Sequence, residues 1–442
     1  MKVELIARTL EKQKYPDEFE PMIVNNDIKV IAGKAAGICY AADDYLSEGI
    51  QDSEKALKRA SFNAKSGHYS VFEHNHLTFL IECSKAMAMV LNSTRLYSTS
   101  EKSARYTKMH PETEFERDFY GKWVGIFSDL IKMKSKDNLD DKAIKKLAME
   151  NARYMTSVFT PTFMEFTIPS SRAILLPGWL DELSNNILDA KLTLSKYNGN
   201  TKIFDIYYDR IASEAVELAD LFRWSIGEIN EPTLKDHKNI GIQFFDTIKF
   251  LNTIKRESLK LDIIDISKIV ENNCDLLSKD YYGDVYESHY NGSFASIAQI
   301  QRHRTTQVSI NIGNPYNMYI PKIIRGTSYE DEWKDDYNIL IKNNICPQAM
   351  ILYTEEKGIF NDFVLKCKER LCARTQLETT EITSYQVEEF NKNKINLSYY
   401  NQRELENISY KDGRAVIRCT FGNYKCNEPC NRKIKSNYLR YI

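Results

Sequence analysis

A cationic cluster lies at residues 299–304, where the chain reads QIQRHR. On a helix, Gln299, Arg302 and His303 stand at positions i, i+3 and i+4 and share one face, and Arg304 ends the run. Two guanidinium groups and an imidazole this close repel one another unless an anion lies between them, and arginine binds phosphate oxygens in a bidentate way. We therefore expect an anionic ligand here. A solvated basic helix end, stabilised by the helix dipole, is the alternative.

A hydroxyl-rich stretch lies at residues 98–106, which read STSEKSARY. Its serine hydroxyls, its backbone N–H groups and Arg105 would form a phosphate cradle if they met in one short turn. Ser98 and Glu101 also have the spacing of a capping box, so the same residues fit the start of a helix.

Potential metal ligands occur in two further places, and neither has the spacing of a metal site. Residues 67–74 read GHYSVFEH, but His68 and His74 do not form a compact helical pair and no extra carboxylate joins them. A polar wall beside a ligand, or a satisfied buried network, is favoured there. Zinc ligation also stays an alternative to free thiols for the C-terminal cysteines, whose spacing is not that of a ribbon or finger: Cys372, Cys419, Cys426 and Cys430. We expect no metal.

The composition is that of a globular protein with two domains. The chain has 442 residues, of which 43% are hydrophobic and 27% charged. A net charge of -1 creates no field that would attract nucleic acid, so small anionic ligands are favoured. The N-terminus lacks the apolar stretch of a signal peptide, and no run of about 18 apolar residues occurs. Nine cysteines without a C-x-x-C pair indicate a reducing cytoplasm.

The elements that must position these groups fall into two segments, 1–230 and 231–442, because a glycine, a proline and charges interrupt the periodicity at 227–238. Hydrophobic spacing predicts a mixed first segment with strands at 3–7 and 76–82, and with helices at 32–45, 52–65, 84–95, 142–157 and 204–224. It predicts helices in the second segment at 244–254, 262–277, 293–304 and 362–385, and strand signals there are thin. We therefore expect an α+β fold whose second half is mostly helical with a reduced sheet.

Taken together, these stretches resemble the flavin-dependent thymidylate synthases, also described as thymidylate synthase complementing proteins. That family is marked by an RHR, a serine five residues after its first arginine, and an S-x-R-Y finish. The first segment has Ser98, Ser103, Arg105 and Tyr106 but lacks the opening arginine and histidine. The second segment has the RHR at 302–304, but it has Gln307 in place of the serine and lacks the S-x-R-Y finish.

Other family motifs are divided between the segments in the same way. The family's nucleotide-contacting glutamine matches Gln299, where the first segment has Val90. The G-H-x-S-x-x-E-H stretch of the flavin pocket is intact only at 67–74. An A-R-Y and a later flavin-contacting arginine match Arg153 and Arg172, the latter displaced by one residue. A nucleotide-binding arginine ahead of A-Q-x-E matches Arg370, with Gln376 and Glu378 following and Thr375 in place of the alanine.

The resemblance implies two tandem repeats of the synthase fold whose losses are complementary, so that one pocket is built from both. It implies reductive methylation of dUMP to dTMP with FAD as cofactor and with 5,10-methylenetetrahydrofolate and NADPH as co-substrates. The implied catalytic residues are Arg370, Arg153 and Gln299. The implied dUMP ligands are Ser100, Glu101, Ser103, Arg105, Gln299, Arg153 and Arg370. The implied FAD ligands are His68, Ser70, Glu73, Arg172, Arg302, His303 and Arg304. Because single-copy members form tetramers, a fused pair would form a homodimer, without nucleic acid or membrane as partner.

Two rival functions stay open. A related flavoenzyme would alkylate another pyrimidine nucleotide, since the replaced residues at Gln307 and around Ile310 would line a wall that affects substrate choice. A non-catalytic homologue would bind nucleotide, or regulate a true synthase, without carrying flavin.

Overall fold

The computed structural model describes residues 1–13, 22–25, 27–38, 48–66, 68–94, 97–104, 107, 109–135, 139–195, 202–227, 273–280, 283–303, 305–310, 314–421, 430, 440 and 442. Helices and sheets are mixed, as the α+β prediction requires. Contacts divide the chain into two compact units that interleave along the sequence: Met1–Lys102, Thr162–Asp189 and Tyr208–Ile242, and Ser103–Pro161, Ala190–Tyr207 and Gln243–Ile442. These units do not coincide with the predicted segments 1–230 and 231–442. That the two segments are tandem repeats stays a prediction. None of the described helices is long and apolar enough to cross a membrane.

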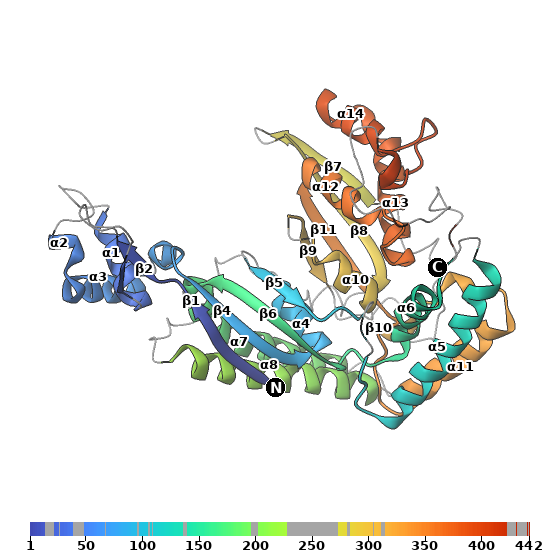
Figure 1. Cartoon of the computed structure of the whole chain (residues 1–442), viewed down its shortest axis with the longest axis horizontal. Helices are drawn as coiled ribbons and strands as arrows, with labels where there is room; N and C mark the ends of the chain where they lie inside the picture. Colours follow the sequence, from blue (N-terminus) through green and yellow to red (C-terminus); the bar gives the residue numbers. More distant parts are fainter. Residues whose placement is uncertain are drawn as a thin grey trace. The chain divides into compact units, whose positions relative to one another are not determined.

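The first unit contains a four-stranded sheet with the strand order β1-β4-β6-β5. Its strands are β1 (Lys2–Arg8), β4 (His76–Ser84), β5 (Ser98–Glu101) and β6 (Pro161–Pro169). Side chains of β4 and β6 alternate between buried and more exposed positions, so one face of the sheet is apolar. The helices α7 (Ser170–Ser195) and α8 (Lys202–Ile226) run along the sheet (Figure 1). Phe79 of β4 packs edge-on against Phe222 of α8, with the ring centroids 5.1 Å apart.

A small helical layer lies between β1 and β4 in the chain. It consists of α1 (Ile28–Ile38), α2 (Glu48–Gln51), α3 (Ser53–Lys65) and the 3₁₀ turn η1 (Tyr69–Phe72), next to a short pair of strands, β2 (Glu11–Gln13) and β3 (Met22–Asn25). The helices α1 and α3 approach so closely at Gly33 that a Cβ atom there would lie 1.8 Å from the carbonyl oxygen of Ala56. Arg59 fixes the layer by donating hydrogen bonds to the carbonyl oxygens of Gly33, Gly49 and Ile50.

The second unit contains a five-stranded sheet with the order β10-β11-β8-β7, and β9 also pairs with β11. Its strands are β7 (Asn273–Asp280), β8 (Gly283–Ser293), β9 (Gln307–Ile310), β10 (Asn314–Met318) and β11 (Met350–Ile359). The helices α12 (Phe360–Arg370) and α13 (Leu377–Lys392) pack on this sheet through an aromatic cluster. In that cluster the ring centroid of Phe390 lies 5.7 Å from that of Tyr286 and 4.7 Å from that of Phe363.

The prediction of a reduced sheet in the second half is therefore wrong, because this sheet has five strands and that of the first unit has four. The strands β8 and β11 bury polar side chains, among them Ser288, Glu355 and Glu356, so their sequences lack the apolar alternation that marks a half-buried strand. The helix predicted at 262–277 is also wrong for residues 273–277, which belong to β7. The rest of that prediction, and the helix predicted at 244–254, lie outside the described residues.

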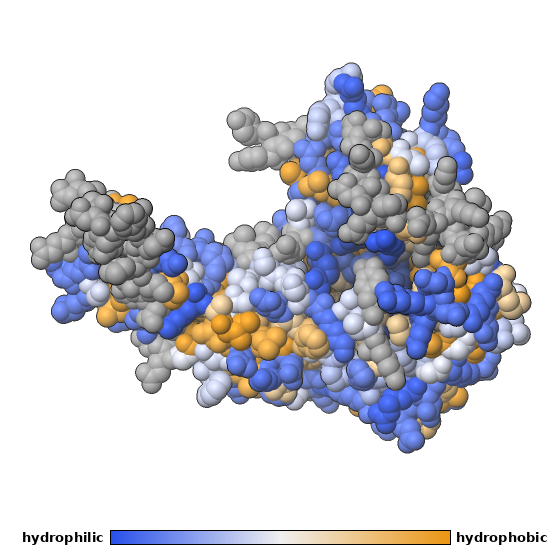
Figure 2. Space-filling model, in the orientation of Figure 1, coloured by the Kyte–Doolittle hydropathy of each residue, from blue (hydrophilic) through white to orange (hydrophobic). Residues whose placement is uncertain are grey.

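The remaining helices belong mainly to the second unit. They are α5 (Glu114–Lys134), α6 (Asp141–Ala152), η2 (Arg153–Met155), α10 (Phe294–Ile300), η5 (Lys322–Ile324), α11 (Ser328–Lys342), η6 (Lys394–Asn396), α14 (Tyr399–Asn407) and η7 (Arg418–Thr420), and α4 (Lys85–Leu91) lies in the first unit. A capping box of Thr113 and Glu116 starts α5. Trp123 of α5 packs on Trp333 of α11 with centroids 4.7 Å apart. Figure 2 shows mainly hydrophilic side chains over α14, which buries Asn401 and Leu405.

The strongest periodic patterns were predicted correctly. The strands expected at 3–7 and 76–82 are β1 and β4, and the helices expected at 52–65 and 204–224 are α3 and α8. Asp52 caps α3 by accepting from the backbone amide of Lys55. Other predicted helices have different bounds in the structure: 32–45 corresponds to α1, 84–95 to α4, 142–157 to α6 and η2, and 293–304 to α10. The helix predicted at 362–385 is two helices, α12 and α13, because the chain turns at Leu371 and resumes at Leu377.

The same order of short elements occurs in each of the two sheets. In the first unit β4 ends at Ser84, a helix of 7 residues follows, and β5 has 4 residues. In the second unit β8 ends at Ser293, a helix of 7 residues follows, and β9 has 4 residues. The interval from Ser84 to Ser98 equals that from Ser293 to Gln307. In each unit the short strand pairs antiparallel with a strand that runs directly into a long helix, β6 into α7 and β11 into α12.

Candidate functional site

Arg153 joins three segments of the second unit. It lies in η2 directly after α6, and it is 6% exposed. Its Nη2 atom donates to the backbone oxygen of Ala295 in α10 at 3.2 Å and also to the side-chain oxygen of Gln376, which caps α13. The A-R-Y motif and the later Q-x-E motif are therefore in contact, although 223 residues separate Arg153 from Gln376.

Glu378 is the buried acceptor beside this contact. Its carboxylate accepts from the hydroxyl of Tyr154 at 2.7 Å, from the backbone amide of Ser293 at 2.7 Å and from the hydroxyl of Ser293 at 2.6 Å. Burial raises the pKa of Glu378, and the hydrogen bonds from Ser293 and Tyr154 oppose that shift. Burial and the nearby Glu378 raise the pKa of Tyr154, so this hydroxyl stays protonated and acts as a donor.

Gln299 and Arg370, which were both predicted to bind dUMP, are in contact. Gln299 lies near the end of α10, and its backbone oxygen accepts from Nη2 of Arg370 at 3.1 Å. The side-chain oxygen of Gln299 accepts from the hydroxyl of Thr379 at 3.1 Å. The Arg370 side chain, at the end of α12, is 11% exposed and also pairs with Glu369 at 3.2 Å. These contacts hold Gln299 between α12 and α13.

Arg302 and His303 do not share a helix face with Gln299, so that part of the prediction is wrong. The helix α10 ends at Ile300, and Arg302 and His303 lie in the turn that follows. The hydroxyl of Thr306 bonds back to the carbonyl oxygen of His303 at 3.2 Å, a local bond of the kind that competes with helix continuation. Arg302 is partly exposed, and Arg304 lies outside the described residues.

His303 is held in a buried position by hydrogen bonds. Its Nδ1 atom lies 3.1 Å from a carboxylate oxygen of Glu369, and its Nε2 atom lies 2.9 Å from the hydroxyl of Thr305. The bond with His303 is the main cause that lowers the pKa of Glu369, and the charge of Arg370 adds to it. Glu369 therefore links two residues of the candidate site, His303 and Arg370.

The hydroxyl-rich stretch begins as a strand of the first unit. Residues Ser98–Glu101 form β5 and pair with β6, so the helix start that the capping-box spacing allowed is wrong. Ser98 and Ser100 are exposed, whereas Glu101 is partly buried. A carboxylate oxygen of Glu101 lies 2.5 Å from the ammonium of Lys85, and the other accepts from Asn92 at 3.3 Å.

The far end of this stretch leads into the second unit. Ser103 is partly buried, and its carbonyl oxygen accepts from the hydroxyl of Thr107 at 2.7 Å. Arg105 and Tyr106 lie outside the described residues. The predicted phosphate cradle, and the predicted convergence of Arg105 with Arg302, therefore stay predictions.

The predicted flavin-pocket residues of the first unit are exposed. His68, Ser70 and Glu73 lie at η1, and all three are exposed, which argues against a satisfied buried network. Arg172 lies in α7 and is partly exposed. Within the part of the chain that the structure describes, no group of three His, Cys, Asp or Glu side chains could hold a metal ion. Cys372, Cys419 and Cys430 form no disulfide bond among the described residues, and Cys426 lies outside them.

Several residues of the candidate site were not assigned from the sequence. Thr379, Glu369 and Lys85 each contact a predicted site residue. Tyr154 and Ser293 contact Glu378 of the Q-x-E motif. Ser293 had a local signal, because a serine followed by an apolar helical run is a typical N-cap. The others had no local signal, since their partners lie on other elements.

The first third of the chain matches a known protein family. Residues 23–171 match the family model described as thymidylate synthase complementing protein. The predicted resemblance to this family is confirmed over these residues. The matched segment of the thymidylate synthase complementing protein family includes His68, Glu101, Ser103, Arg105 and Arg153, whereas the sites predicted from Arg172 onward lie beyond it. Among curated proteins there is no match.

Solved structures give distant similarities. A UMP/dUMP methylase PolB from Streptomyces cacaoi, bound with 5-Br dUMP, is 18% identical, and the alignment covers 41% of this chain and 76% of that chain with a TM-score of 0.26. Thymidylate Synthase X (ThyX) from Helicobacter pylori, with FAD and dUMP, is 18% identical, and the alignment covers 54% of this chain and 97% of that chain with a TM-score of 0.27. Sequence identities and TM-scores this low carry no argument about the family, so the family resemblance depends on the match over residues 23–171.

Proposed function

We propose that this protein is a flavin-dependent methyltransferase that converts dUMP to dTMP, with 5,10-methylenetetrahydrofolate as carbon donor, NADPH as reductant and FAD as cofactor. The family match over residues 23–171 supports the general activity. The observation that carries the proposal for this site is the bond from Arg153 to Gln376, together with the bond from Arg370 to Gln299. Residues that the family resemblance assigns to one nucleotide thus meet around α10, although they are far apart in sequence.

The proposed site is a composite of two repeats. The shared order of strand, 7-residue helix and 4-residue strand after Ser84 and after Ser293 supports a duplication. In the same register Val90 corresponds to Gln299, and Ser98 to Gln307, so each copy lacks what the other keeps. Under this proposal the hydroxyl stretch of one repeat and the cationic turn of the other serve the same ligands, and a homodimer provides the assembly that four single copies would form.

The roles of the side chains follow from their chemistry. Ser100, Glu101, Ser103, Arg105, Gln299, Arg153 and Arg370 would bind dUMP, with Arg370, Arg153 and Gln299 acting at the reacting base. Arginines suit the phosphate because a guanidinium can donate two parallel hydrogen bonds to its oxygens. Gln299 is restrained through both of its oxygens, which orients its amide group before the substrate binds.

The residues proposed for FAD fit a phosphate-bearing, hydroxyl-rich cofactor. Arg302, which is partly exposed, supplies positive charge together with Arg304 and Arg172, and His303 is fixed in orientation by Glu369. His68, Ser70 and Glu73 are exposed at η1 and offer donors and acceptors for ribityl and ribose hydroxyls. When bound, the flavin would supply the hydride, and the protein would supply binding, orientation and charge.

The test is the absorbance spectrum of the purified protein, followed by its bleaching on addition of NADPH. The proposal expects a flavin spectrum, bleaching, and dTMP formation from dUMP. Arg105→Ala and Arg370→Ala should each abolish most of the turnover, whereas Arg403→Ala on the exposed side of α14 should retain it. A colourless protein that is indifferent to Arg105→Ala would instead indicate a non-catalytic homologue. Assays with UMP and dCMP separate the related alkylating flavoenzyme from a dUMP enzyme.

A further inference from the structure

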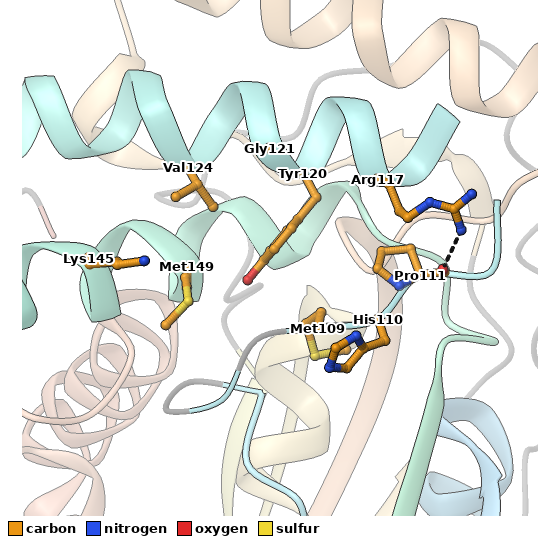
Figure 3. Close-up of a pocket in the computed structure, with 9 residues that line it drawn as sticks. All are labelled: Met109, His110, Pro111, Arg117, Tyr120, Gly121, Val124, Lys145 and Met149. Carbon is orange, nitrogen blue, oxygen red and sulfur yellow. Dashed lines mark hydrogen bonds between the residues drawn. The ribbon is translucent and has the colours of Figure 1, made fainter. Parts of the chain in front are cut away.

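A cavity of about 510 Å³ lies in the second unit between α5, α6 and the segment 109–111. It is lined by Met109, His110, Pro111, Arg117, Tyr120, Gly121, Val124, Lys145 and Met149 (Figure 3). None of these residues is among those proposed for dUMP or FAD. A cavity of this size lies in the range of small-molecule sites, about 300–1,000 Å³.

The floor of the cavity is apolar and buried. Met109, Pro111 and the ring of Tyr120 are buried, and the partly exposed Val124 and Met149 extend this surface along α5 and α6. Two thioethers beside an aromatic ring provide a polarisable surface that suits a flat aromatic group. The floor therefore favours a planar apolar body.

One polar atom is buried in this floor. The hydroxyl of Tyr120 points into the cavity (Figure 3), and this residue is 4% exposed. Among the described residues no group completes a hydrogen bond to it by distance and angle. Burial raises the pKa of Tyr120, although the adjacent backbone amide of Met109 and the charge of Arg153 lower it. A buried hydroxyl whose proton has no acceptor is unfavourable in the free protein, and it becomes satisfied if a ligand supplies one.

The rim of the cavity is cationic. Arg117, Lys145 and His110 are exposed at the opening, and the lining contains no Asp or Glu. Arg117 is held in place because its Nη1 atom donates to the backbone oxygens of Pro111 at 3.2 Å and of Glu112 at 3.0 Å. The ammonium end of Lys145 extends toward the cavity (Figure 3). This rim favours an anionic group on the ligand.

From these features we propose that the cavity between α5 and α6 is a second small-molecule site, which takes a planar aromatic carboxylate. The ring would lie against Met109, Met149 and Val124, and the carboxylate would lie at the end of the cavity where Lys145 extends toward it (Figure 3). The hydroxyl of Tyr120, which points toward the Lys145 side of the cavity (Figure 3), would donate to the same carboxylate. This proposal does not depend on the proposed synthase activity.

Binding of 2-naphthoate to the full chain, measured by calorimetry without FAD or dUMP, tests the site. The proposal expects saturable binding, and about tenfold weaker binding of the uncharged 2-naphthalenemethanol, since one charge-assisted contact contributes roughly that factor. Absence of binding by 2-naphthoate, or equal binding of the alcohol, overturns the proposal. Displacement of 2-naphthoate by dUMP would also overturn it, because the site would then not be separate.

Variants locate the binding in the cavity. Val124→Trp fills the space and should abolish binding, whereas Val216→Trp, at an exposed position of α8 outside the lining, should not. Lys145→Gln should weaken binding of 2-naphthoate about tenfold, and Lys142→Gln on the same helix but outside the lining should not. Tyr120→Phe should weaken binding of 2-naphthoate, because the variant lacks the hydroxyl that would donate to the carboxylate. Binding that survives Val124→Trp would place the ligand elsewhere.

Discussion

Ser84 and Ser293 make the same two side-chain hydrogen bonds in the two units of the chain. Each ends a central strand and caps the next helix, Ser84 by accepting from the backbone amide of Met87 and Ser293 by accepting from that of Ser296, both at 3.1 Å. Each hydroxyl also donates to a glutamate of a long helix, Glu214 of α8 and Glu378 of α13. In each unit one serine therefore both caps a helix and links it to a glutamate on another helix.

Replacing these serines should have unequal effects. Ser84→Ala should lower the free energy of unfolding by about 1 kcal/mol, because a cap is lost while Glu214 keeps its bond from Arg210 at 2.9 Å. Ser293→Ala should cost about 2–3 kcal/mol, because the fully buried Glu378 also loses a donor. Urea unfolding followed by circular dichroism measures both, and a larger loss for Ser84→Ala would contradict the role assigned to Glu378.

Arg153→Lys should weaken both the fold and nucleotide binding. The lysine side chain is shorter than that of arginine, so its ammonium cannot take the place of the Nη2 atom that donates to both Ala295 and Gln376, and a buried acceptor is left unpaired. We expect a loss of about 1–3 kcal/mol in the free energy of unfolding and about tenfold weaker binding of dUMP by calorimetry. The matched control is Arg414→Lys, whose pair with Asp412 at 2.8 Å is exposed, and it should change stability by less than about 1 kcal/mol. An unchanged affinity in Arg153→Lys would remove Arg153 from the proposed dUMP site.

Lys366→Met should destabilise the second unit in a pH-dependent way. Lys366 and Glu356 form a fully buried pair at 2.7 Å, and the hydroxyls of Tyr286 and Tyr290 also donate to Glu356. Burial alone raises the pKa of Glu356, but Lys366 and the two tyrosines outweigh it, so the pKa lies below its ordinary value of 4.5. Removing Lys366 should cost about 3–5 kcal/mol at pH 7, because a charge is left buried without its partner.

The sign of the pH effect reverses in that variant. In the native protein the stability from Glu356 is present above pH 4.5 and is lost as the pH falls through its lowered pKa. In Lys366→Met burial dominates and the pKa of Glu356 should rise above 4.5, so the loss of stability should grow as the pH rises and shrink toward pH 4.5. Thermal unfolding at several pH values measures this. Lys392→Met, which breaks an exposed pair with Glu389, is the control, and a pH-independent loss in Lys366→Met would refute the assignment.

Lys85→Met should weaken dUMP binding, although we expect Lys85 itself not to contact the nucleotide. Lys85 is a positioning residue for Glu101, the last residue of β5. Its ammonium pairs with the carboxylate of Glu101 and fixes the orientation of that side chain. Without it we expect Glu101 to reorient and the affinity for dUMP to fall about tenfold. Lys58→Met, which breaks an exposed pair with Glu54 at 2.7 Å, should leave the affinity unchanged. If Glu101→Gln and Lys85→Met weaken binding additively, the two residues act independently and the positioning role is wrong.

The sequence by itself determined the elements with strong apolar periodicity and the family resemblance that is confirmed over residues 23–171. The helices α3 and α8 and the strand β4 have the expected spacing, because local burial of one face imposes it. The motifs at 67–74 and 98–106 lie within the segment that matches the thymidylate synthase complementing protein family. These signals are local, so they can be read along the chain.

Tertiary structure alone decided the second sheet and the geometry of the candidate site. The strands β8 and β11 are stabilised by pairing with each other and by the buried Glu356 and Lys366, which no local pattern marks as core. The turn after Ile300, which separates Arg302 from the face of Gln299, likewise depends on contacts of His303 with Glu369 on another helix. Hydrogen bonds between residues far apart in the chain form only after folding, and they are the physical reason that Arg153 meets Gln376.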